Sequence, residues 1–197
     1  MAEIAQKLTS REIQFTYEDY LLLPDDGKRY EIIEGELFMT PAPVTKHQNI
    51  LIALGKHLFD FVEKNKLGVV FLAPYDVILS KTNVVQPDIV YVSHKNRHII
   101  TEKNIQGSPD LTVEIISANT RECDTVLKKK LYARFEVKEY WIVFPDEEKI
   151  EIWQLQNKNF VLTEEFQKSD LLTTSLLPGL QIPLKEVFRS LDDYFKK

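Results

Sequence analysis

Cysteine and glycine are both scarce in this sequence. A single cysteine, Cys123, occurs among 197 residues, which excludes an internal disulfide and a cysteine-ligated metal cluster. Six glycines and the lack of any glycine- or serine-rich run leave no flexible linker. We therefore expect a single domain over residues 1–197, with its core at about 16–165 and a C-terminal extension at 166–197.

Long apolar runs and positive charge are lacking as well. No apolar stretch approaches the roughly 18 to 20 residues of a membrane helix, and residues 1–11 have no apolar core of the signal-peptide kind. We therefore expect no membrane partner and a cytoplasmic location. The net charge of −5 argues against a broad nucleic-acid-binding surface, although a local basic patch beside an acidic metal site remains compatible with it. The sequence contains neither a glycine-rich phosphate loop nor a Gly-x-Ser-x-Gly nucleophile motif.

The patterns that are present predict an α/β or α+β fold, in which a central mixed β-sheet is flanked by two long helices. A short helix with a Thr16–Asp19 capping box is expected first, and Glu34-Gly35 is expected at a hairpin turn. The expected strands and hairpin arms are 30–39, 69–75, 77–79, 84–92, 111–116, 139–144, 149–155 and 160–164.

The two long helices are expected at 45–64, opened by a capping box at Thr45–Gln48, and at 121–134. Each carries an apolar stripe that should face the sheet. The stripe of the first helix consists of Leu51, Leu54, Leu58, Phe61 and Val62. The stripe of the second consists of Cys123, Val126, Leu127 and Leu131.

Glu114 is the central candidate for chemistry, because it lies within the apolar run Leu111–Ile116. The β-branched content of this run favours a buried strand. An ionised carboxylate there costs several kcal/mol unless a positive group pairs with it. A divalent metal ion is one candidate partner, and a nearby lysine or arginine is the other.

Two Pro-Asp pairs offer a second carboxylate. Asp88 follows Pro87 within the apolar segment 84–92, and it can converge with Glu114 if the two strands pair. Asp110 lies on the same expected strand as Glu114, and four strand residues span roughly 13 Å, which is too far to share one ion. Asp88 is therefore the better candidate, and paired oxygen ligands suit Mg²⁺ or Mn²⁺. The alternative is an aspartate that only forms a turn.

Other polar residues have structural explanations beside functional ones. Asp124, Lys128 and Tyr132 recur every four residues and share one helix face; a surface Asp124–Lys128 pair would contribute only about 0.3–0.5 kcal/mol. His47 lies near the positive end of a helix, which disfavours its protonated form and suits a metal or water contact. Glu34 is typical of a turn.

An ordered set of segments runs from about residue 30 to residue 145, namely Tyr30–Glu36, His47, Gln86–Asp88, Pro109–Ser117, Asp124–Lys128, Leu131-Tyr132 and Glu139–Val143. Taken together, these segments resemble the PD-(D/E)XK nuclease superfamily and, more closely, the Uma-two family of bacterial restriction endonucleases. The resemblance implies a restriction-endonuclease-like core.

The resemblance also implies roles for individual residues. Asp88 and Glu114 would bind Mg²⁺ or Mn²⁺, with the backbone carbonyl of Ile115 as a further ligand. The superfamily places its catalytic lysine two residues after the acid, where this sequence has Ile116; the following helix would supply Lys128 instead. Glu34 and His47 would lie on the rim of the site.

We therefore expect a metal-dependent endonuclease that hydrolyses phosphodiester bonds of DNA. One alternative is a catalytically inactive nuclease fold that binds nucleic acid or a protein, and another is a structural subunit of a toxin–antitoxin or mobile-element system. A homodimer is expected, because two sites related by a two-fold axis cut both strands most simply. Its interface would use C-terminal apolar residues that alternatively pack on their own sheet: Leu177, Leu180, Phe188 and Phe195.

Overall fold

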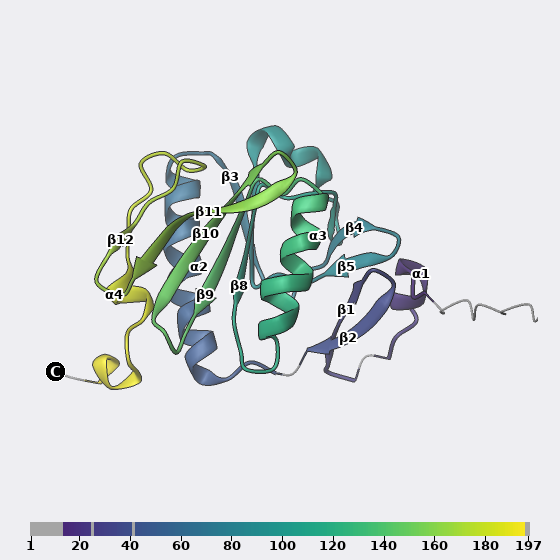
Figure 1. Ribbon diagram of the computed structural model, residues 1–197, viewed down its shortest axis with the longest axis horizontal. Helices are drawn as coiled ribbons and strands as arrows, with labels where there is room; N and C mark the ends of the chain where they lie inside the picture. Colours follow the sequence, from purple (N-terminus) through teal and green to yellow (C-terminus); the bar gives the residue numbers. More distant parts are fainter. Residues whose placement is uncertain (1–13, 25, 41, 196–197) are drawn as a thin grey trace, which may run out of the picture.

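Two β-sheets form the framework of the protein in a computed structural model that describes residues 14–24, 26–40 and 42–195 (Figure 1). The six-stranded sheet has the order β11-β10-β9-β8-β6-β3. Its strands are β3 (Gly68–Leu72), β6 (Ile89–Ser93), β8 (Leu111–Ile115), β9 (Glu139–Phe144), β10 (Lys149–Gln156) and β11 (Asn159–Gln167). The five-stranded sheet has the order β2-β1-β5-β4-β7. Its strands are β1 (Arg29–Ile33), β2 (Glu36–Thr40), β4 (Val77–Ser80), β5 (Asn83–Val85) and β7 (Ile105–Gln106).

The larger sheet is mixed, as expected, and helices cover both of its faces. β8 pairs with β9 in parallel and with β6 antiparallel. Helix α2 (Thr45–Lys64) packs on one face, and the π-helix η2 (Cys123–Lys128), continued by α3 (Lys129–Arg134), lies on the other together with the smaller sheet (Figure 1). Burial on both faces explains why β8 and β9 are fully buried.

The first long helix is confirmed at its predicted position. Four residues of its predicted stripe are buried, and the fifth, Phe61, packs against the same core while partly exposed. The predicted capping box is wrong, because the helix is preceded by Val44, whose side chain makes no capping hydrogen bond. Packing of the apolar stripe therefore stabilises this helix without a side-chain cap.

The second helix spans the predicted residues, but its predicted core face is right for only two of four residues. Leu131 is buried and Cys123 packs against the core while partly exposed. Val126 and Leu127 are each 38% exposed, whereas Asp124 and Lys128 are buried. The segment from Cys123 to Lys128 is a π-helix, whose wider turn rotates side chains away from the positions of an α-helix. The polar side chains that face inward meet other charged groups there, as described below.

The predicted strand over 84–92 is divided into two. β5 ends at Val85 in the smaller sheet, and β6 begins at Ile89 in the larger one. Pro87 has no N–H to donate to a strand partner, and the N–H of Gln86 donates to the Glu31 carboxylate at 2.7 Å. Asp88 therefore lies where the chain passes from one sheet to the other.

Most of the remaining elements agree with their predictions. The helix α1 (Tyr17–Tyr20) begins with the Thr16–Asp19 capping box, and Glu34-Gly35 joins β1 to β2 with positive φ angles at both residues. The hairpin of β10 and β11 turns at Asn157-Lys158.

The C-terminal segment completes the core beside α2. It contains β12 (Leu171–Leu172), β13 (Ile182–Pro183), α4 (Leu184–Val187) and the 3-10 helix η3 (Leu191–Tyr194). Leu177, Leu180 and Phe188 are at most 4% exposed in this core, whereas Phe195 is 83% exposed. Three of the four residues considered for a dimer interface thus pack within their own chain, and the homodimer stays a prediction.

No helix within residues 14–24, 26–40 and 42–195 has both the length and the apolarity needed to cross a membrane.

Replacing Leu54 with alanine tests the packing of α2 on the sheet. Leu54 is fully buried, so Leu54→Ala should lower the free energy of unfolding by about 2–5 kcal/mol. Ile52→Ala on the same helix is the control; Ile52 is 61% exposed, and its loss should change stability by no more than about 0.5 kcal/mol. Urea denaturation measures both, and equal effects would contradict the proposed orientation of α2.

Candidate active site

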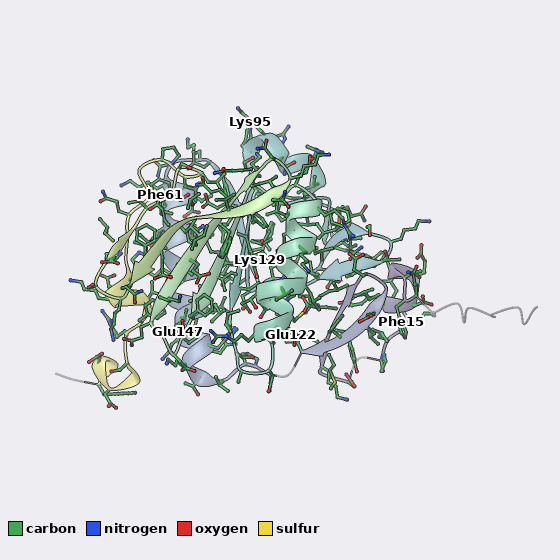
Figure 2. All side chains as sticks on the ribbon, viewed as in Figure 1. Phe15, Phe61, Lys95, Glu122, Lys129 and Glu147 are labelled. Atoms are coloured by element: carbon green, nitrogen blue, oxygen red, sulfur yellow. The ribbon has the colours of Figure 1, made fainter. Side chains whose placement is uncertain are left out.

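A cavity of about 640 Å³ opens between the β1–β2 hairpin, the start of α2 and the loop after β8. Four buried carboxylates and one buried ammonium group are among the groups that line it, contributed by Glu31, Asp88, Glu114, Asp124 and Lys128. All five residues are at most 6% exposed. Glu122 and Glu147 are the neighbours in sequence of the cavity-lining residues Cys123 and Asp146. Figure 2 labels both in the lower part of the view, on the side of the molecule opposite Lys95.

The pairing of β6 with β8 brings Asp88 and Glu114 together. The register pairs Ile89 with Val113, and its continuation by one residue places Asp88 opposite Glu114. Residues directly opposite each other in an antiparallel pair project from the same face of the sheet. The sequence expectation that these two carboxylates converge depended on this pairing, which is present.

Two donors hold the carboxylate of Asp88 in place. Its Oδ2 accepts a hydrogen bond from the backbone N–H of Ile115 at 2.8 Å and lies 3.0 Å from Nε2 of His47. His47 is in the first turn of α2 and buried, and its Nδ1 has no hydrogen-bond partner among the described residues. Donation from Nε2 to the carboxylate leaves Nδ1 of a neutral ring as a buried acceptor.

Glu114 accepts two hydrogen bonds from the helix that follows β8. Its Oε1 is 2.7 Å from the hydroxyl of Tyr132 and 3.0 Å from Nζ of Lys128. Burial raises the pKa of Glu114 well above its usual value; Lys128 opposes this effect, and nearby carboxylates raise the pKa further. The ionised form of Glu114 is thus costly unless more positive charge is supplied.

Lys128 lies at the centre of the carboxylates. Its Nζ is 2.9 Å from Glu31 and 3.4 Å from Asp124, in addition to its contact with Glu114. Burial also raises the pKa of Asp124, to about 6, although the Lys128 ammonium opposes the shift. The interpretation of Asp124 and Lys128 as a surface ion pair is therefore wrong, because both side chains are buried.

Sequence reasoning did not identify Glu31 as a site residue. It reaches the cluster from β1 in the smaller sheet, a contact that no local pattern predicts. A signal was nevertheless present, since Glu31 lies beside the apolar residues Ile32 and Ile33, much as Glu114 lies within an apolar run. Both are carboxylates on buried strand segments.

Two other candidate acids lie outside the cavity. Glu34 is at the β1–β2 turn with a φ of 54°, and it pairs with Arg134 on the surface. Asp110 is 1% exposed, accepts a hydrogen bond from the backbone N–H of Ser93 at 2.6 Å, and pairs with Lys138. The structure thus does not bring Glu34 to the cluster, and it gives Asp110 a structural role.

The composition of the cluster fits a divalent cation. Four carboxylates and one ammonium are buried together, so full ionisation would give these five groups a net charge of −3. Oxygen donors of this kind suit Mg²⁺ or Mn²⁺. In the part of the chain that the structure describes, no three histidine, cysteine, aspartate or glutamate side chains are grouped as a metal site, and the Lys128 ammonium lies between the acids.

The fold and the cluster define an α/β protein with an acidic, lysine-containing site. The model of the Uma2 family, described as "Putative restriction endonuclease", matches residues 17–185, so the chain belongs to this family. The resemblance to the Uma-two family seen in the sequence is thereby confirmed.

A solved structure has the same fold. It is a crystal structure of a "putative nuclease belonging to DUF820" from Anabaena variabilis ATCC 29413, with 22% identity and a TM-score of 0.74. The match covers 88% of this chain and 97% of the other. A search among curated proteins finds no match.

Removing the ammonium at the centre of the cluster should destabilise the fold. Lys128→Met leaves buried carboxylates without their partner and should cost about 3–5 kcal/mol in urea unfolding at neutral pH. Lys130→Met, at an exposed position two residues away, is the matched control and should have little effect. Adding Glu114→Gln to Lys128→Met should recover part of the loss; equal effects of the two lysine variants would contradict the arrangement.

Asp110 should contribute to stability in a pH-dependent way. Burial raises the pKa of its carboxyl, but Lys138 and the N–H of Ser93 lower it by more, so the pKa lies below its usual value. A depressed pKa stabilises the fold above the unfolded value of about 3.9, and this contribution is lost as the pH falls through the folded value. The stability difference between wild type and Asp110→Asn should therefore shrink between about pH 5 and pH 2. A constant difference would contradict this role.

Proposed function

We propose that this protein is a metal-dependent endonuclease that hydrolyses phosphodiester bonds of DNA. The observation that carries the proposal is the convergence of Asp88, Glu114 and Lys128 in one cavity. Membership of a family described as "Putative restriction endonuclease" supports it, as does the shared fold with a protein described as a "putative nuclease".

Asp88 and Glu114 would hold the metal ion, with the backbone carbonyl of Ile115 as a third donor. When bound, a divalent cation makes a water molecule more acidic and neutralises charge that develops on the phosphate. His47 and the N–H of Ile115 fix the Asp88 carboxylate through its Oδ2. They would keep this ligand oriented, as hydrogen-bonding neighbours of metal ligands generally do.

Lys128 would orient the attacking water and stabilise negative charge on the phosphate. Its ammonium is within hydrogen-bond distance of Glu114, next to the carboxylate assigned to the ion. A positive group fixed beforehand in a buried site stabilises developing charge without further reorganisation. The superfamily pattern places the catalytic lysine at the position of Ile116, whose side chain is apolar. In this protein Lys128, from the helix after β8, would take the role of that lysine.

Glu31 and Asp124 would hold Lys128 for this role. They contact the ammonium from a strand of the other sheet and from one turn earlier on the same helix. Three acidic contacts raise the pKa of Lys128 well above its usual value, although burial alone would lower it. The lysine is therefore a positive group in this site and not a general base.

The two buried Pro-Asp aspartates offer a matched test of the proposal. Asp88→Asn should abolish cleavage of plasmid or single-stranded DNA in the presence of Mn²⁺ or Mg²⁺, because it removes a proposed ligand. Asp110→Asn has the same chemistry at a buried site outside the cavity and should retain activity under conditions where it is folded. Equal loss in two folded variants would contradict the assignment of Asp88.

Metal binding can be measured without catalysis. Mn²⁺ should raise the melting temperature of the wild-type protein at concentrations above its Kd, and Asp88→Asn should reduce this shift more than Asp110→Asn does. The absence of a shift in wild type at saturating Mn²⁺ would count against a metal-dependent site.

A further inference from the structure

The lining of the cavity combines apolar and polar residues. Apolar residues come from β2 and from the connection to α2, namely Phe38, Met39, Ala42, Pro43 and Val44. The loop after β8 adds Ile116 and the small or polar residues Ser117, Ala118, Asn119 and Thr120. Phe38 lies opposite Glu31 in the strand register, so it shares the face of the hairpin that carries Glu31 and Arg29. Such a lining can accommodate the flat apolar face of a nucleobase and the polar sugar-phosphate that carries it.

The reactive groups are buried, so a phosphate on the surface of a straight double helix does not easily reach them. Asp88, Glu114 and Lys128 are only 3–6% exposed, so a scissile phosphate must enter the cavity to approach them. Double-stranded DNA has a persistence length of about 50 nm, and bending a short site already costs several kcal/mol. An unpaired strand bends freely and can place one nucleotide inside, as enzymes that act on unpaired or flipped-out nucleotides require.

The charge around the cavity also favours a short contact with one strand. Proteins that bind duplex DNA tightly commonly neutralise about 6–10 phosphates, whereas this chain has a net charge of −5. Lys46 at the cavity pairs with Asp146, and Lys128 pairs with the acidic cluster. Among the described residues, Arg29 lines the cavity without an ion-pair partner, so its guanidinium is available to a phosphate.

We propose that the substrate is single-stranded DNA, with one unpaired base held against Phe38 and an adjacent phosphate bound by Arg29. This inference rests on the proposed nuclease function of the same cavity. Aromatic side chains bind bases of single strands with little sequence preference. Arg29 and Phe38 would thus help select an unpaired strand, whereas Asp88, Glu114 and Lys128 would act on its phosphate.

Cleavage of matched substrates tests the inference. The same DNA sequence is presented to the wild-type protein with Mn²⁺ as a single strand, as a blunt duplex and as a duplex with an unpaired flap. The single strand and the flap should be cut with a kcat/KM at least roughly tenfold above that of the duplex, because both present bases that can stack. An equal or faster reaction on the blunt duplex would overturn the proposal.

Binding measurements separate this proposal from the proposed function. Fluorescence anisotropy without a metal ion should show tighter binding of the single strand than of the duplex, even if no substrate is cut. Arg29→Gln should weaken single-strand binding by roughly tenfold, which is the usual scale for a charged hydrogen bond to phosphate. Arg97→Gln, at an exposed arginine that does not line the cavity, is the matched control and should bind as wild type does.

A second variant guards against a fold defect at Arg29. Phe38→Leu keeps an apolar side chain where Phe38 packs against the core and removes the aromatic ring, so it should change stability by less than about 1.5 kcal/mol and still weaken single-strand binding. Met39→Ala, at a residue that is 59% exposed and projects from the other face of the strand, should bind as wild type does. Equal binding of single strand and duplex, or two arginine variants that behave alike, would overturn the choice of substrate. Absence of cleavage with a preserved preference for single strands would overturn only the nuclease function.

Discussion

The central physical constraint in this protein is the burial of four carboxylates around one ammonium group. Lys128 makes contacts of 2.9–3.4 Å with Glu31, Glu114 and Asp124. Asp88 lies in the same cavity and is hydrogen-bonded to His47 and to the backbone N–H of Ile115. Buried charges are tolerated only when partners and hydrogen bonds compensate for lost hydration. The groups that compensate Asp88 and Glu114 come from α2, β8, η2 and α3, so their arrangement depends on the tertiary fold.

Departures from regular secondary structure concentrate at this cluster. The chain changes sheets at Pro87, which places Asp88 directly before the first residue of β6. The backbone N–H of Gln86 has no strand partner among the described residues and donates to Glu31. The π-helix η2 turns Asp124 and Lys128 inward and leaves Val126 and Leu127 partly exposed. π-helical segments are often found at functional sites. The same local irregularities that complicate prediction thus assemble the candidate active site.

Two aspartates with similar sequence contexts differ in the role that their tertiary surroundings favour. Asp88 and Asp110 both follow proline and are both buried. Asp110 is satisfied by Lys138 and a backbone N–H, whereas Asp88 lines a cavity with three further buried carboxylates. An acidic group with excess negative neighbours can bind a cation, whereas a fully paired one stabilises the fold. The difference lies in which residues surround each carboxylate, and those neighbours are remote in sequence.

Local sequence determined much of the secondary structure, because strand alternation, turn residues and the stripe of α2 are short-range patterns. It also identified Asp88 and Glu114 as candidates, since carboxylates within apolar runs require partners, whereas the resemblance to the Uma-two family indicated Lys128. Only the tertiary structure decided that Glu31 joins them, that Asp124 is buried, and that Glu34 pairs with Arg134 outside the cavity. The physical reason is that burial and electrostatic partners arise from contacts between the two sheets and the helix, which short-range patterns do not encode.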